Sequence, residues 1–280
     1  ILIQTKEKIN FPIIIDYQNF WPEELIENKI INRNSKTYNF LMSKERQIIK
    51  KADFIITPSE ELKKYLIKRF KIHDDARIEK VVNGGNPILK TPLNKHFPPK
   101  IINAGMVVKR SNMQLFLNSI PYIIKKYPKA EIYITKKGED LKKIMKLIKK
   151  MNLNSNIRFY WEDTYQEFLK FLAKCHVGVV TSTYNLTRRL GFVTKIYDYF
   201  AVGVPVVGNS VGGWTSIISE EKLGLLSSND PHDLAEKIVK VIENDQLGKE
   251  FGKAAIEILK TKYSIKSSAK SLIKVINKCI

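Results

Sequence analysis

The sequence alternates short β-branched runs with longer amphipathic stretches, and this alternation constrains the fold more than any other feature. Pro12 to Asp16 is a β-branched run that ends in a polar residue, which is typical of a buried parallel strand. Leu141 to Met151 carries its apolar residues on one face at helical spacing, with lysines opposite. Strands and helices in alternation favour a parallel sheet flanked by helices, so we predict an α/β fold.

The alternation runs in two series. Before residue 84 it predicts strands at 12–16, 52–57 and 78–82, and helices at 36–51 and from Ser59. After residue 99 it predicts strands at 100–104, 130–135, 156–160, 177–181 and 204–208. The helices of this second series are expected at 112–126, 141–151, 165–174, 194–202, 213–219, from 230, and from 265. About three βα units therefore precede the gap and some six follow it.

The stretch between the two series, residues 84–99, carries four prolines and no periodicity, which indicates a domain boundary. We predict a partial Rossmann-like domain at 1–90, a linker at 91–99, a second Rossmann-like domain at 100–262 and a C-terminal helix at 263–280. The first domain looks incomplete at its N-terminus. The first residue is Ile1 rather than methionine, so either a segment was removed or the sequence begins inside a longer chain. We expect the second, because only about three βα units precede the boundary.

Composition excludes several classes of protein. With 44% hydrophobic residues among 280, the chain can bury a core and is not expected to be disordered. No apolar run approaches the roughly 20 residues of a membrane-spanning helix, and no signal peptide is visible. Cys175, Cys279 and the four scattered histidines have no disulfide or metal-ligand spacing. We therefore expect no metal, no cofactor and a reducing, cytoplasmic location.

The charge is unusual, with 48 basic against 28 acidic residues and a formal net charge of +20. Such a surface attracts nucleic acid, anionic membranes or phosphorylated small molecules, although a solvated lysine surface explains it equally well. The lysines spread over many helices without a known nucleic-acid-binding pattern, so we expect no nucleic-acid partner. Peripheral association with an anionic membrane stays open.

Ligands of a parallel α/β sheet bind at the carboxyl ends of the strands, where helix N-termini present free N–H groups. After the strand at 100–104, Gly105 lets a ligand approach the backbone, and Lys109 or Arg110 can pair with a phosphate. After the strand at 156–160, Tyr160 and Trp161 can stack on a nucleobase or belong to the core.

The stretch from Thr194 to Gly203 is the richest in candidate residues. Thr194 and Lys195 begin a helix, so Lys195 can neutralise a phosphate at its N-terminus. One turn later, Asp198 can accept hydrogen bonds from two vicinal hydroxyls of a ribose without a metal. Gly212 and Gly213 open another helix and offer an anion or sugar contact.

Polar residues also end the first predicted strand. Asp16 ends this strand, and Gln18 and Asn19 follow it. All three are expected to face the ligand crevice from the acceptor side. Asp16 can serve there as a general base or can cap its own loop.

Taken in order, these features resemble the GT-B glycosyltransferases, specifically the group 1, family 4-like branch. The residues that carry the resemblance are Ala52 to Ser59 with Asn83-Gly84, Gly105 with Lys109 or Arg110, Lys195 to Val207, Gly212-Gly213, and Asp230 to Ala235. The resemblance extends from about Phe11 to the C-terminus. Each motif alone is unspecific, whereas all five in order are fairly specific.

The resemblance implies two Rossmann-like domains that face a crevice, the first incomplete here, and a final helix that crosses back to the first domain. It implies transfer of a sugar from a nucleotide diphosphate sugar to a glycan, lipid-linked or other acceptor, retaining and without a metal. Asp198 would hold the ribose, and Lys195 with Lys109 or Arg110 would hold the diphosphate and act as the electrophilic catalytic groups.

Three positions depart from the family pattern. Asp198 stands where the family usually has Glu, Leu190 where many members have a second Glu, and Ser216 where an acid commonly follows the glycine pair. Two alternatives therefore stay open. One is a nucleotide-sugar epimerase of the same fold, and the other is a catalytically degenerate binding protein.

Overall fold

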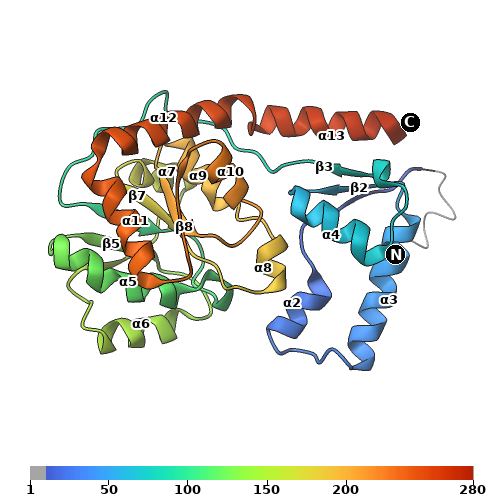
Figure 1. Cartoon of the computed structure of the whole chain (residues 1–280), viewed down its shortest axis with the longest axis horizontal. Helices are drawn as coiled ribbons and strands as arrows, with labels where there is room; N and C mark the ends of the chain where they lie inside the picture. The colour runs from blue at the N-terminus through green and yellow to red at the C-terminus, as the bar shows by residue number, and fades with distance from the viewer. Residues whose placement is uncertain (1–10, 280) are drawn as a thin grey trace. The chain divides into compact units, whose positions relative to one another are not determined.

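The computed structural model describes residues 11–279, and the chain divides into two compact units. Unit 1 holds the residues up to Asn83 together with Asn185–Phe192 and the C-terminal helix from Ile265. Unit 2 holds Gly84–Tyr184 and Val193–Ser264. Figure 1 shows both units and labels most of their helices and several of their strands. The first ten residues of the predicted N-terminal domain, including Ile1, lie outside the described residues.

Unit 1 contains a parallel sheet in the order β1-β2-β3 within the described residues. Its strands are β1 (Ile14–Asp16), β2 (Phe54–Thr57) and β3 (Ile78–Lys80). Its helical segments are α2 (Trp21–Glu27), α3 (Lys36–Lys51), α4 (Glu60–Phe70), η1 (Asp75–Arg77), α8 (Leu186–Leu190) and α13 (Ile265–Cys279). Ser59 caps α4 as expected, because its hydroxyl accepts from the Leu62 N–H at 3.2 Å.

A buried ion-pair network joins three helices of unit 1. The carboxylate of Glu23 on α2 is 1% exposed and accepts hydrogen bonds from Arg69 on α4 at 2.8 Å and from Tyr38 on α3 at 2.7 Å. Arg33 pairs with its other oxygen at 2.6 Å. Because breaking such a pair leaves a buried charge uncompensated, the network holds these helices in one arrangement.

Unit 2 contains a six-stranded parallel sheet within the described residues, in the order β6-β5-β4-β7-β8-β9. The strands are β4 (Lys100–Asn103), β5 (Glu131–Thr135), β6 (Ile157–Tyr160), β7 (Val177–Val180), β8 (Val206–Asn209) and β9 (Gly224–Ser227). This is the doubly wound order of a dinucleotide-binding fold, which reverses between β4 and β7. The predicted α/β fold with parallel sheets is confirmed.

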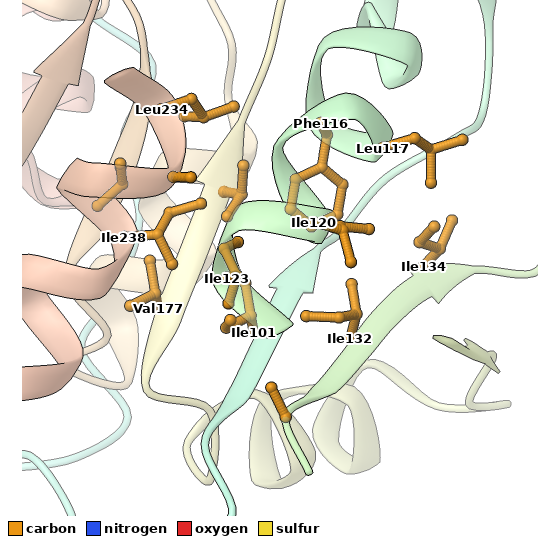
Figure 2. Packing of buried hydrophobic residues seen from close by; sticks show 14 of the residues in the cluster. Ile101, Phe116, Leu117, Ile120, Ile123, Ile132, Ile134, Val177, Leu234 and Ile238 are labelled. Atoms are coloured by element: carbon orange, nitrogen blue, oxygen red, sulfur yellow. The ribbon is translucent and has the colours of Figure 1, made fainter. Parts of the chain in front are cut away.

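The helices of unit 2 cover both faces of this sheet. They are η2 (Lys109–Ser111), α5 (Met113–Lys126), α6 (Leu141–Lys150), α7 (Tyr165–Leu172), α9 (Lys195–Ala201), α10 (Thr215–Glu220), α11 (Pro231–Glu243) and α12 (Asp245–Thr261). Figure 2 shows the core under α5 and α11, where Phe116 and Ile120 lie over Ile101 and Ile132 of the strands. Tyr199 of α9 covers the opposite face, because its ring lies where a side chain on Gly178 would project.

The division of the chain differs from the predicted one in two places. Residues 84–99, expected to end the first domain and link the two, belong to unit 2, since the Gly85 N–H donates to the Tyr263 carbonyl and that of Ile88 to Ala201. Residues 185–192 come from the middle of the predicted second domain but belong to unit 1, where the carboxylate of Glu27 accepts from the Thr187 N–H at 3.1 Å.

Six elements of the described residues have no counterpart in the sequence prediction, namely α2, η1, η2, α8, α12 and β9. The longest of them, α12, contains Gly248 and Gly252, which lower helix propensity. Gly252 is required by packing, because a Cβ there would lie 2.4 Å from the carbonyl oxygen of Gly203. Tertiary contact therefore explains a glycine that weakens the local helix signal.

Candidate functional site

The carboxyl ends of β4 and β7 lie at the point where the strand order of unit 2 reverses, which is where ligands bind in this class of sheet. Buried polar side chains join the two ends. The amide of Asn103 donates to the Thr181 hydroxyl at 3.2 Å, and this hydroxyl donates to the Ser111 carbonyl at 2.7 Å. The loop after β4 is thus tied to the end of β7.

Lys195 begins α9 and reaches this same point. Its Nζ donates to the Asn103 side-chain oxygen at 3.0 Å and to the Ala104 carbonyl at 2.7 Å. Asn103 is 1% exposed, so it forms a rigid support for the ammonium group. The structure therefore places a positive charge at the end of β4, where an anionic ligand of the sheet would lie.

Asp198 lies one turn further along α9 and is half-buried. Its Oδ1 accepts a hydrogen bond from the Tyr165 hydroxyl at 2.6 Å. Burial raises the pKa of this carboxyl, whereas the bond from Tyr165 and the charge of Lys195 act to lower it. Asp198, predicted to bind the ribose, and Lys195, predicted to bind the diphosphate, thus project from the same short helix.

The buried hydroxyl of Tyr199 fixes how α9 sits on the sheet. It accepts from the Ala104 N–H at 3.0 Å, and it lies 3.3 Å from the Val179 carbonyl and 3.4 Å from the Ile102 carbonyl. Its ring can approach the strands only because Gly178 has no side chain, since a Cβ there would lie 2.5 Å from the ring. This packing aligns Lys195 and Asp198 with the end of β4.

Gly105 follows β4 directly and has a positive φ of +99°, a backbone conformation that favours glycine. Its N–H donates to the Thr135 hydroxyl at 3.1 Å, at the end of β5. A Cβ at this position would lie 3.6 Å from Cδ of Lys195. The predicted glycine and the predicted lysine are therefore neighbours.

Lys109 and Arg110 lie in η2, with both residues exposed. The Arg110 carbonyl accepts from the Thr183 N–H at 3.2 Å, which anchors η2 beside the segment that follows β7. Their assignment to the diphosphate remains a prediction.

The two candidate aromatic residues after β6 have different environments. Tyr160 is 9% exposed and stacks on Phe171 with ring centroids 4.1 Å apart, so its ring packs in the protein interior. Trp161 is 50% exposed, and the ammonium of Lys137 lies 4.7 Å from the centre of its ring. Of the two, Trp161 has the accessible ring that base stacking requires.

Gly212 and Gly213 precede α10, and Gly212 has a φ of +117°. The Trp214 side chain beside them is fully buried, and its ring NH donates to the Val211 carbonyl at 2.8 Å. Ser216, at the position of the common family acid, donates to the Gly213 carbonyl at 3.2 Å. Thr194 is exposed and lies at the N-cap position of α9 without a side-chain capping bond.

In unit 1, Asp16 ends β1, and its carboxylate accepts from the Gln18 amide at 2.6 Å. Asn83 donates in turn to the Gln18 side-chain oxygen at 3.3 Å. Asn19 is exposed. The hydrogen bond within this loop agrees with the capping alternative for Asp16, and the acceptor-side role remains a prediction.

Three polar residues of the site escaped the sequence analysis. Asn103 and Asn209 are buried at the ends of β4 and β8, and Tyr165 begins α7. The Asn209 side chain accepts from the Ser182 N–H at 2.9 Å and donates to its carbonyl at 2.8 Å. An asparagine that ends an apolar strand is a usable signal for such a support, but nothing near Tyr165 in the sequence points to Asp198.

Over residues 11–279, no group of three or more His, Cys, Asp or Glu side chains is placed to hold a metal ion. Within the same range, no helix is both long enough and apolar enough to cross a membrane.

Comparisons with known proteins agree with the fold and the motifs. An uncharacterized glycosyltransferase of Methanocaldococcus jannaschii is 22% identical over 267 residues, covering 91% of this chain and 65% of the relative. The poly(ribitol-phosphate) alpha-N-acetylglucosaminyltransferase of Staphylococcus aureus is 25% identical over 214 residues, covering 75% of this chain and 42% of the relative. The chain therefore spans less than two thirds of the length of these relatives.

Among solved structures, the HepE protein of Anabaena in complex with UDP-glucose superposes with a TM-score of 0.78 at 14% identity, over 99% of this chain and 75% of that protein. At this identity the likeness concerns the fold. The model of the glycosyl transferases group 1 family matches residues 88–258, which is more than half of the chain and includes β4 to α12 except the last turn. The chain is a member of the group 1 glycosyltransferases, with the GT-B type of fold.

Proposed function

We propose that this chain belongs to a glycosyltransferase in which unit 2 binds a nucleotide diphosphate sugar and the sugar passes to a glycan or lipid-linked acceptor. The observation that supports this most is the position of Lys195 and Asp198. They lie one turn apart on α9, and the Lys195 ammonium contacts the end of β4, where the strand order reverses. A nucleoside diphosphate offers a cis-diol and an anion, which are the two groups that this pair would bind.

In the proposed reaction, the bond between the sugar and the terminal phosphate breaks, and negative charge grows on the departing diphosphate. Lys195 meets this need as a preorganised cation, because Asn103 and Ala104 already fix its ammonium group. Lys109 and Arg110 on η2 supply further positive charge. No metal is required for this stabilisation if these cations bind both phosphates.

Two stereochemical courses are compatible with the proposal. In a retaining transfer, the acceptor hydroxyl attacks on the leaving-group face and its proton passes to the departing phosphate, so no protein base is needed. An inverting transfer needs a base, for which Asp16 is the candidate in unit 1. We propose the retaining course, since Asp16 already accepts a hydrogen bond within its own loop.

The sugar side of the site departs from the family pattern. Leu190 packs against the core of unit 1, with Ile55 and Leu66 among the residues of that core. Ser216 hydrogen-bonds within its own turn. We therefore propose that other groups contact the transferred sugar here, and that donor binding depends chiefly on the nucleotide diphosphate.

The proposal is tested by calorimetric titration of the chain with UDP, GDP and ADP, followed by the corresponding nucleotide sugars. UDP is the first probe because the HepE protein is seen in complex with UDP-glucose. Binding of at least one diphosphate that weakens in both Lys195→Ala and Asp198→Ala supports the proposal. If both variants bind the diphosphate as tightly as the wild-type chain does, the assigned site is contradicted.

A further assay separates transfer from the two alternatives. The full-length protein is incubated with the bound nucleotide sugar, with and without a polyol-phosphate or glycan acceptor. Release of nucleotide that depends on acceptor indicates transfer, whereas conversion of the free nucleotide sugar to an isomer indicates an epimerase. Binding without either reaction indicates a degenerate binding protein.

A further inference from the structure

Tyr165 is the one residue outside the family motifs that touches Asp198 through a hydrogen bond within the described part of the chain. Its hydroxyl lies 2.6 Å from Oδ1 of Asp198. The backbone at this point is fixed, because Thr164 caps α7 by accepting from the Glu167 N–H at 3.2 Å. The residue is nevertheless 61% exposed, so burial of the ring does not explain the contact.

The contact uses only part of the capacity of the carboxylate. An ionised carboxylate has two oxygens with about four acceptor positions, and Tyr165 occupies one of them. Oδ2 accepts no hydrogen bond from residues 11–279. A ribose diol needs two acceptor positions, so it can bind while the bond from Tyr165 stays in place.

The contact also compensates for the side chain of Asp198, which is shorter than the Glu that the family usually has at this position. A half-buried aspartate without a partner would populate several orientations, and burial favours its neutral form. A neutral carboxyl accepts fewer hydrogen bonds from a diol than an ionised one. The hydroxyl of Tyr165 opposes both effects, because it fixes one oxygen and stabilises the negative charge.

Resting on the proposed function, we propose that Tyr165 is a positioning residue, which holds the carboxylate of Asp198 in the orientation that receives the ribose hydroxyls of the donor. It acts through Asp198 and need not touch the reacting atoms. Preorganisation of this kind strengthens binding by removing the cost of ordering the side chain when the ligand arrives.

The test compares Tyr165→Phe with the wild-type chain in titrations with UDP and with 2′,3′-dideoxy-UDP, which lacks the diol. We expect the variant to bind UDP about twofold to tenfold more weakly, because the Asp198 side chain must then be ordered when the ribose binds. Its affinity for dideoxy-UDP should stay unchanged. Tyr122→Phe is the matched control, since Tyr122 is an exposed tyrosine on α5 that contacts His232 instead.

A pH series adds a readout that a merely structural role would not move. The ionisable groups that act on Asp198 are Tyr165 on α7 and Lys195 on its own helix, while Tyr199 lies beside it. Helix α12 also packs on α9, and the titratable residue that follows it, Tyr263, contacts Tyr197 of α9. Without the bond from Tyr165 the pKa of Asp198 rises, so UDP binding should fail at a higher pH on the acid side. Dideoxy-UDP shares the phosphate titration and corrects for it.

The possible results separate this inference from the proposed function. If Asp198→Ala weakens UDP binding and Tyr165→Phe does not, the positioning role is overturned and the nucleotide site stands. An equal loss for UDP and dideoxy-UDP in Tyr165→Phe would also overturn it, because the effect would not involve the diol. If neither Asp198→Ala nor Lys195→Ala changes UDP affinity, the proposed function fails and this inference fails with it.

Discussion

Replacement of Lys195 by methionine is the sharpest test of the site. The Lys195 Nζ donates hydrogen bonds to Asn103 Oδ1 at 3.0 Å and to the Ala104 carbonyl at 2.7 Å. Methionine keeps an apolar chain beside Gly105 but removes the charge and both bonds. The substitution therefore separates the role of the ammonium group from the role of the stem.

The magnitude follows from these contacts. Asn103 is 1% exposed, so its oxygen loses a partner that water does not easily replace, and we expect a loss of about 1–3 kcal/mol in the free energy of unfolding. Loss of a charged partner for the diphosphate should cost a further 1–3 kcal/mol of binding, or roughly a 5-fold to 150-fold rise in Kd for UDP. Uridine lacks phosphates, so its affinity should not change.

The assay is calorimetric titration with UDP and uridine beside urea denaturation of the same samples. Lys146→Met is the matched control, because Lys146 is exposed on α6 and should affect neither quantity. Asp198→Asn should show the opposite pattern, with uridine and UDP weakened alike through the ribose. An equal loss for uridine and UDP in Lys195→Met would refute the phosphate role of this residue.

Three further predictions concern other parts of unit 2. Gly138→Ala should destabilise the chain by more than about 1 kcal/mol in urea denaturation, because φ is +137° and a Cβ would lie 2.1 Å from the Val107 carbonyl oxygen. Gly248→Ala is the control. Its Cβ would have its nearest contact at 3.6 Å, so this substitution should be neutral or stabilising. Burial lowers the pKa of His176 from 6.5 to about 4, so the unfolded chain binds more protons between these values. Stability should accordingly fall by up to about 3 kcal/mol as pH drops from 6.5 to 4, and His176→Gln should lose this dependence. Trp161→Ala should weaken uridine and UDP equally, by about 1–3 kcal/mol, if its exposed ring stacks on the base; unchanged uridine affinity would exclude that role.

The sequence alone sufficed to predict most of the fold. Apolar runs such as Val177–Val180 are buried along their whole length, and the amphipathic pattern of Leu141–Lys150 forms α6 as expected. The family was identifiable for the same reason, because glycines, prolines and polar residues that end strands recur at fixed spacing. Residues 185–192 show the limit of this reasoning, since local pattern does not reveal that a segment between two strands of one unit packs in the other.

The candidate site also has a part that the sequence could predict and a part that it could not. The position of Lys195 and Asp198 in the first turn of a helix was predictable from the sequence. Their roles stay predictions, which rest on the known relation between such a helix N-terminus and a ligand. Tyr160 shows what the sequence left open, since the pattern allows a core ring or a stacking ring and only packing against Phe171 places it in the interior. The same local sequence is compatible with a core ring and with a stacking ring at Tyr160, so its periodicity could not distinguish the two.

The sequence by itself determined which candidate residues, with side chains suited to a nucleotide diphosphate, follow the ends of the parallel strands. What only the tertiary structure decided is which of them support one another. Asn103 beneath Lys195 and Tyr165 beside Asp198 lie 92 and 33 residues from their partners along the chain. No local propensity encodes a hydrogen bond over such a separation, because it exists only once the sheet has brought β4, α7 and α9 together.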